Sequence, residues 1–225
     1  MPTKREICMR RRPTTLAALT VLTAAFATGC GSGDDKPDPM RGQQWGLDAL
    51  KLPDAWKNSN GADTVIAVVD TGVDLDHPDL KGRLVDGYDF VDNDDEPKDM
   101  NGHGTHDTPV LVVNAADQSG KPASFTNFGA QNAVSAPGVD ILSTLPTYTT
   151  KETLKNTTGY GKLSGTSMAS PYVSAVAALL HQQGLDPAAI TRTIRDSAAN
   201  PRNLVKLGLG NVDAAAAVKA AAAKN

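Results

Sequence analysis

The sequence predicts an α/β fold built on a doubly wound, mostly parallel sheet, and two stretches carry this prediction. The first, Thr64 to Asp74, reads TVIAVVDTGVD: an apolar run ends at Asp70 and a Thr-Gly turn, as expected where a buried parallel strand ends. The second, Leu163 to Leu180, reads LSGTSMASPYVSAVAALL: a Gly-Thr-Ser turn containing Ser167 leads into apolar residues at helical spacing. Chemistry in open α/β sheets collects at the carboxyl ends of the strands.

The remaining elements follow from local patterns. Short apolar runs predict strands, and polar stretches rich in Gly or Thr predict loops. A Gln-Gly stop and an Asp-Pro start separate the two helices after the Ser167 turn. Aromatic residues make up only 4% of the chain, so the core must be built from Ala, Val and Leu. The predicted strands are 84–91, 110–116 and 139–143, the last after a Ser-Ala-Pro-Gly turn; the predicted helices are 53–57, 187–198 and 214–224; and 147–162 is predicted to be a surface loop.

Ser167 is a candidate nucleophile because of its predicted place at the start of a helix. Pro171 fits the first turn, where its missing N–H costs little. A serine there lies at the positive end of the helix dipole and is held by a turn. For an arbitrary Gly-Thr-Ser the commoner interpretation is a serine that merely caps a buried helix.

Two partners for such a serine precede it in the chain. Asp70 ends the first predicted strand, and the segment NGHGTH places His103 between two glycines. Asp, His and Ser are the three groups of acyl-transfer catalysis: the serine attacks, the histidine takes and returns its proton, and the aspartate orients the histidine. The three motifs together therefore favour a catalytic serine over a simple cap.

These motifs resemble those of the subtilisin-like serine peptidases, the subtilase family, over residues 43–212. VVDTGVDLDHPDL resembles the aspartate motif, NGHGTH the histidine motif and GTSMASP the serine motif, in the order Asp, His, Ser. ASFTNFG and SAPGVDILST resemble family segments between the last two. The resemblance implies a serine endopeptidase acting on polypeptides, with Ser167 as nucleophile, His103 as general base and Asp70 as orienting carboxylate. It implies structural roles for Asp74, His77 and His106.

The chain departs from this family after His106. Asp-Thr-Pro follows, which is hostile to the helix that family members have there, and then comes the predicted strand 110–116. The separation of His103 from Ser167 is well under half that of the family, so a large internal block is missing. The missing block includes the Ser-Gly-Gly stretch that pairs with substrate and the Ala-Gly-Asn motif whose asparagine donates to the oxyanion. We therefore expect an incomplete or strained sheet.

The loss of that motif leaves Asn114 as the candidate oxyanion donor, together with the Ser167 backbone N–H. The alternative for Asn114 is a solvent-facing or strand-end amide. Loss of one such donor costs about 10²–10³ in turnover. Two hypotheses remain open: a serine endopeptidase, supported by the complete triad, and an inactive relative that at most binds peptides or does not fold independently, supported by the missing strands.

The first thirty residues predict an export signal. A basic segment precedes the apolar stretch 16–27, which is too short to span a bilayer comfortably. Small residues precede Cys30, as in bacterial lipoprotein signals, so we expect lipidation at Cys30 and a bacterial protein exported to the cell surface and anchored in the membrane. The alternative is an ordinary secretory signal that leaves Cys30 a free thiol. Residues 31–42 predict a solvated linker, which leaves 43–225 as the peptidase domain with its central part missing.

The net charge and the acidic residues indicate which binding partners to expect. A net charge of −3 gives no reason to expect nucleic acid binding, and 225 residues suggest one domain, expected to be a monomer. The acidic turn DNDDEPKD places Asp92, Asp94 and Asp95 close together, and such carboxylates can bind calcium. Acidic surface loops are common, however, and the glycine turn of known calcium loops is absent here. The predicted chemistry itself requires no cofactor.

Overall fold

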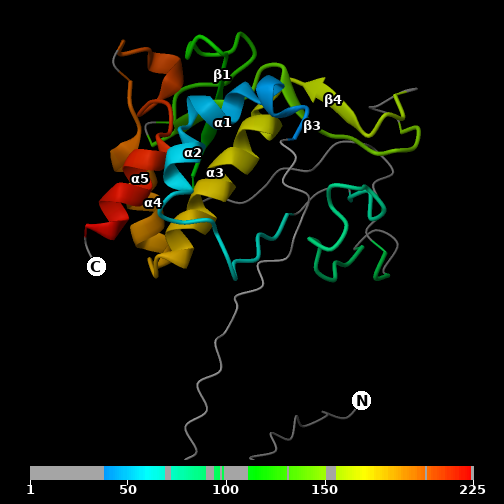
Figure 1. The fold of residues 1–225 in the computed structure, drawn as a ribbon. Helices are drawn as coiled ribbons and strands as arrows, with labels where there is room; N and C mark the ends of the chain where they lie inside the picture. The colour runs from blue at the N-terminus through cyan, green and yellow to red at the C-terminus, as the bar shows by residue number, and fades with distance from the viewer. Residues whose placement is uncertain are drawn as a thin grey trace, which may run out of the picture. The chain divides into compact units, whose positions relative to one another are not determined.

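The computed structural model describes residues 38–68, 72–89, 94–96, 98, 111–130, 132–150, 156–200 and 202–223 (Figure 1). The description concerns the unit that begins at Asp38. In chain order its elements are η1 (Arg41–Gln43), α1 (Trp45–Ala49), α2 (Leu52–Ala55), β1 (Val113–Ala116), β2 (Val134–Pro137), β3 (Ile141–Thr144), β4 (Tyr160–Leu163), α3 (Thr166–Gln182), α4 (Pro187–Ser197), η2 (Val205–Leu207) and α5 (Ala214–Ala222).

The strands form two separate two-stranded sheets in the described part of the chain. β1 and β2 are parallel, with Val113 opposite Val134 and Ala116 opposite Pro137. β3 and β4 are antiparallel neighbours. The predicted α/β class agrees with a parallel pair covered by α3, but these small sheets do not show the doubly wound arrangement.

The strand predicted at the Asp70 motif is wrong for its described residues. Residues 64–68 have no strand structure, and Val65 and Val68 are 68% and 72% exposed. A continuous apolar run is stable as a strand when neighbouring strands bond its backbone and helices cover both faces. Within the described residues no strand pairs with 64–68, which agrees with the expected missing block. Residues 84–88 of the second predicted strand are likewise exposed and have no strand structure.

Two strands were not predicted. β2 lies where a Ser-Ala-Pro-Gly turn was expected, and it tolerates Pro137 because this residue is the last in the strand. The first three of the four residues of β4 lie in the predicted loop 147–162, and its strand structure depends on pairing with β3. The helices predicted from Ser167 onward are confirmed as α3, α4 and α5, and the strand predicted at 110–116 is confirmed over Val113–Ala116 as β1.

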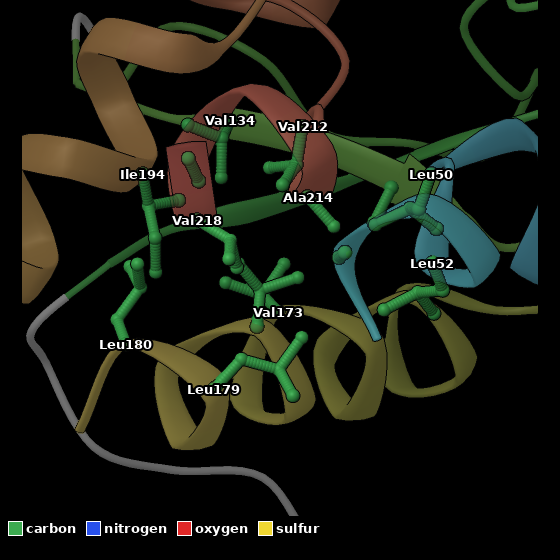
Figure 2. Close-up of a cluster of buried hydrophobic side chains, with 14 of the residues drawn as sticks. Leu50, Leu52, Val134, Val173, Leu179, Leu180, Ile194, Val212, Ala214 and Val218 are labelled. Atoms are coloured by element: carbon green, nitrogen blue, oxygen red, sulfur yellow. The ribbon is translucent and has the colours of Figure 1, made fainter. Parts of the chain in front are cut away.

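The core of the described residues is one cluster of aliphatic side chains around α3. α3 packs on β1 and β2 and contacts α4 and α5. Its buried residues Val173, Val176 and Leu180 recur at helical spacing and so line one face. Figure 2 shows the α3 side chains meeting those of the other helices and of β2, and the labelled contributors from outside α3 are Leu50, Leu52, Val134, Ile194, Val212, Ala214 and Val218.

Side-chain caps and one polar clamp fix the ends of these helices. Asp186 accepts a hydrogen bond from the Ala189 N–H (2.7 Å) at the start of α4, and Asp213 accepts one from the Ala216 N–H (2.9 Å) at the start of α5. At the end of α3, Gln182 Oε1 accepts hydrogen bonds from three donors in residues 59–61. This clamp ties the start of the segment that leads toward Asp70 to the helix that begins beside Ser167. Within the described residues, no helix is long and apolar enough to span a membrane.

Candidate active site

Ser167 is the second residue of α3 and lies at the carboxyl ends of the parallel strands. The Gly165 N–H donates to the carbonyl of Gly138 (2.8 Å), which directly follows β2. The Met168 N–H donates to the Gly165 carbonyl (3.1 Å) and closes the first turn. Ser167 itself is partly exposed. The expected place for a catalytic residue in an α/β sheet is therefore occupied by this serine.

A close backbone approach holds this turn against the strand ends. A Cβ atom on Gly138 would lie 2.6 Å from the Ala115 Cβ and 2.8 Å from the Gly165 carbonyl oxygen. Only glycine fits such a separation without movement of the backbone. This close approach holds the turn that carries Ser167 against the ends of β1 and β2.

The start of α3 offers a donor for an oxyanion. N–H groups in the first turn of a helix have no partner within that helix, and the helix dipole favours negative charge there. The backbone N–H of Ser167 belongs to this turn. A substrate carbonyl attacked by the Ser167 hydroxyl would develop its negative charge near this N–H.

Asn114 does not share this position. Its Nδ2 donates to the carbonyl of Lys206 (3.0 Å), and the neighbouring Ser135 on β2 donates to the carbonyl of Leu207 (3.0 Å). Both side chains therefore face η2, whereas the next residue of β1, Ala115, faces the core and the Gly165 turn. This arrangement argues against the oxyanion role for Asn114. It also contradicts a solvent-facing amide, because Asn114 is only 5% exposed and lies within β1 with a structural partner.

Several predicted site residues lie outside the described residues, namely Asp70, His103, His106, Asp92 and Cys30. Asp94 and Asp95 are described and exposed, and Asp94 Oδ1 accepts a hydrogen bond from the Glu96 N–H (2.9 Å). The described residues hold no group of three or more His, Cys, Asp or Glu side chains placed to bind a metal. Calcium binding at the acidic turn therefore stays a prediction.

Asp74 and His77 form a buried polar cluster just after the Asp70 motif. Asp74 is 6% exposed and His77 is fully buried. Burial raises the pKa of Asp74, but hydrogen bonds from the backbone and hydroxyl of Thr147 and from the Asp76 N–H outweigh it and leave that pKa below its usual range. These contacts agree with the structural roles that the motif resemblance implies. Sequence patterns gave no sign that Thr147 is the partner.

Comparison with models of known protein families shows the family to which this chain belongs. The family model described as the subtilase family matches residues 61–109 and 107–215, well over half of the chain. The chain belongs to the subtilase family. The match breaks into two parts at residues 107–109, the position at which the sequence departs from the family pattern. This break agrees with a missing internal block in a subtilase.

The relatives of this subtilase also support the family and the missing internal block. It is 29% identical over 263 residues to the thermophilic serine proteinase of Bacillus sp. (strain AK1), covering 70% of this chain and 62% of that protein. It is 27% identical over 256 residues to thermitase of Thermoactinomyces vulgaris, covering 69% of this chain and 88% of that protein. Since 70% of 225 residues is about 158, about 105 of the 263 positions aligned with the first relative fall opposite gaps in this chain.

A solved structure supports the fold. Fervidolysin from Fervidobacterium pennivorans, described as a keratinolytic enzyme related to subtilisin, matches with a TM-score of 0.63 over 81% of this chain and 46% of its own. The sequence identity is 21%, so this likeness concerns the fold alone. The described elements of this subtilase are therefore the remaining parts of a subtilisin-like α/β fold.

Proposed function

We propose that this chain is a serine endopeptidase that hydrolyses peptide bonds through an acyl-enzyme formed on Ser167. One observation carries the proposal: the serine of the GTSMASP motif lies in the first turn of α3, at the carboxyl ends of β1 and β2. His103 would be the general base and Asp70 the orienting carboxylate, as the family motifs imply. The relatives named above are called serine proteinase and thermitase, in agreement with this class.

The proposed reaction has two halves. The Ser167 hydroxyl attacks the scissile carbonyl while His103 takes its proton, and His103 then protonates the leaving amine. Asp70 holds the imidazole in the correct tautomer and stabilises the imidazolium. Water then attacks the acyl-enzyme by the same steps and frees Ser167. In both tetrahedral intermediates the Ser167 N–H would donate to the oxyanion.

Turnover should be slow because the oxyanion site lacks one of its hydrogen-bond donors. The family's donor asparagine has no counterpart in this chain, and Asn114 donates to Lys206 instead. Loss of one such donor lowers turnover by about 10²–10³. We therefore propose a slow peptidase whose acylation is easier to detect than its turnover.

An inactive relative is the second candidate function. The exposed run Val65 to Val68 and the two small sheets favour it, because the strands that would bind a substrate backbone are absent from the sequence. Such a protein would keep the outline of the fold and bind peptides without cleaving them. Reactivity of Ser167 separates the two candidates.

A fluorophosphonate serine-hydrolase probe tests the proposal. The unaltered chain should become labelled, Ser167→Ala should not, and Ser174→Ala should be labelled normally. Ser174 is a matched control because it lies in the same helix and its hydroxyl donates within α3 to the Ser170 carbonyl. A folded chain that takes up no label would refute the peptidase proposal and favour the inactive relative.

The proposal also includes a location and a partner. The substrate would be a polypeptide, and the monomeric protein would be exported and held at the membrane by a lipid on Cys30. Family membership leaves location open, since relatives include an intracellular serine protease of Paenibacillus polymyxa and an extracellular protease of Xanthomonas campestris. Incorporation of an alkyne-tagged fatty acid that is lost in Cys30→Ser would support lipidation, and equal incorporation in both would contradict it.

A further inference from the structure

A buried polar cluster joins the segment after Asp70 to the hairpin before Ser167. Asp74 Oδ2 accepts hydrogen bonds from the backbone N–H and the hydroxyl of Thr147, both at 2.8 Å. His77 Nε2 lies 2.7 Å from the carbonyl oxygen of Gly159. These contacts link residues that are 73 and 82 positions apart in the sequence. Thr147 follows β3, and Gly159 immediately precedes β4.

The hydrogen bonds around His77 determine which of its ring nitrogens carries the proton. His77 Nδ1 accepts a hydrogen bond from the Asp79 N–H (3.1 Å), so the neutral ring carries its proton on Nε2 and donates to Gly159. The Tyr160 ring packs edge-on against the imidazole, with centroids 5.2 Å apart. A Cβ atom on Gly159 would lie 3.0 Å from His77 Nε2, and this glycine has a φ of +79°. A side chain at that position would therefore press on the imidazole and strain the backbone.

The hairpin formed by β3 and β4 connects this cluster to the turn that carries Ser167. β4 pairs with β3 along its whole length, and it leads through Gly165 into Ser167. On the other side, Asp74 follows Asp70 by four residues, so their Cα atoms are at most about 14 Å apart in an extended chain. The cluster thus fixes the chain close to the aspartate motif against the element that holds the serine motif.

We propose that Asp74 and His77 are positioning residues for the reaction at Ser167. They would act by holding the chain next to Asp70, and they would not touch the substrate. The inference rests on the proposed peptidase function. Displacement of a catalytic group by about 1 Å from a remote change can cost about 10²-fold in rate. Loss of the cluster should therefore slow acylation of Ser167 even when the protein remains folded.

The test compares variants of Thr147 in the full chain. Thr147→Val removes the hydroxyl that donates to Asp74, and Thr147→Ser keeps it. Thr157→Val makes the same chemical change at an exposed threonine before β4 and serves as the local control. For each variant the second-order rate constant of fluorophosphonate labelling is measured well below the melting temperature, together with the melt itself.

Positioning predicts a specific pattern of rates. Thr147→Val should be labelled about tenfold more slowly than the unaltered chain, while Thr147→Ser and Thr157→Val stay within about twofold of it. If folded Thr147→Val is labelled at the unaltered rate, whatever its melting temperature, the cluster is only structural and the inference is wrong. If the unaltered chain takes up no label, the proposed function fails and the inference fails with it.

Discussion

Replacing Gly138 with alanine should displace the turn that carries Ser167. The new Cβ would lie 2.6 Å from the Ala115 Cβ and 2.8 Å from the Gly165 carbonyl oxygen, so one of these backbones must move. Overpacking of this kind costs about 1–3 kcal/mol. The hydrogen bond from the Gly165 N–H to the Gly138 carbonyl, 2.8 Å long, is worth about 1 kcal/mol if it is lost.

A change in the entropy of the unfolded chain partly offsets this loss of stability. Alanine reduces the entropy of the unfolded chain, which returns about 0.4–1 kcal/mol. The net decrease in the free energy of unfolding should be about 2 kcal/mol. Because the displaced turn holds Ser167, fluorophosphonate labelling should slow by about 10²-fold, as expected for a misplacement of about 1 Å.

Urea denaturation followed by circular dichroism measures the stability change. Gly42→Ala is the matched control, since a Cβ atom on Gly42 would meet nothing within 4 Å, and its stability should change by no more than about 0.5 kcal/mol. Equal stability and equal labelling rates for Gly138→Ala and Gly42→Ala would refute the close approach described for the Ser167 turn.

Three further predictions concern the clamp, the buried carboxylate and the acidic turn. Gln182→Ala should lower the free energy of unfolding by about 1–2 kcal/mol, because its Oε1 accepts three hydrogen bonds from residues 59–61; an unchanged urea midpoint would contradict this. The pKa of Asp74 is lowered in the folded state, so its contribution to stability is complete above the unfolded pKa of about 3.9 and is lost as pH falls through the folded pKa. Thr147→Val should raise that folded pKa and move the acid-unfolding midpoint to higher pH, and no movement would count against the hydrogen bond. Chelation of calcium should lower the melting temperature if the acidic turn binds the ion, and Asp94→Asn should remove that effect; identical melts with and without calcium would contradict calcium binding.

The helical half of the fold could be predicted because its signals are local. Asp186 and Asp213 cap α4 and α5, and the small apolar residues after Ser167 recur at helical spacing. The place of Ser167 at a turn before a helix also follows from the sequence around it. Each of these features depends on neighbours within a few residues along the chain.

The sheets could not be predicted in the same way because strands depend on distant partners. The run Val65 to Val68 has the composition of a buried strand, yet it is exposed because the expected neighbours are absent from the sequence. β4 reads YGKL, which has no run of apolar residues, and it is a strand because β3 pairs with it. The sequence around Asn114 predicts a candidate oxyanion donor, but its amide donates instead to the Lys206 carbonyl (3.0 Å), a partner 92 positions away.

Active-site titration tests whether Ser167 forms an acyl-enzyme, because it counts acylated chains without requiring fast turnover. The chain is mixed with a peptide p-nitrophenyl ester, and the burst of p-nitrophenol is measured together with mass mapping of the acylated peptide. A nucleophilic Ser167 predicts a burst that approaches one equivalent per chain, an acyl group on Ser167, and no burst from Ser167→Ala. A chain that melts cooperatively but gives no burst, or that is acylated at another residue, would contradict it.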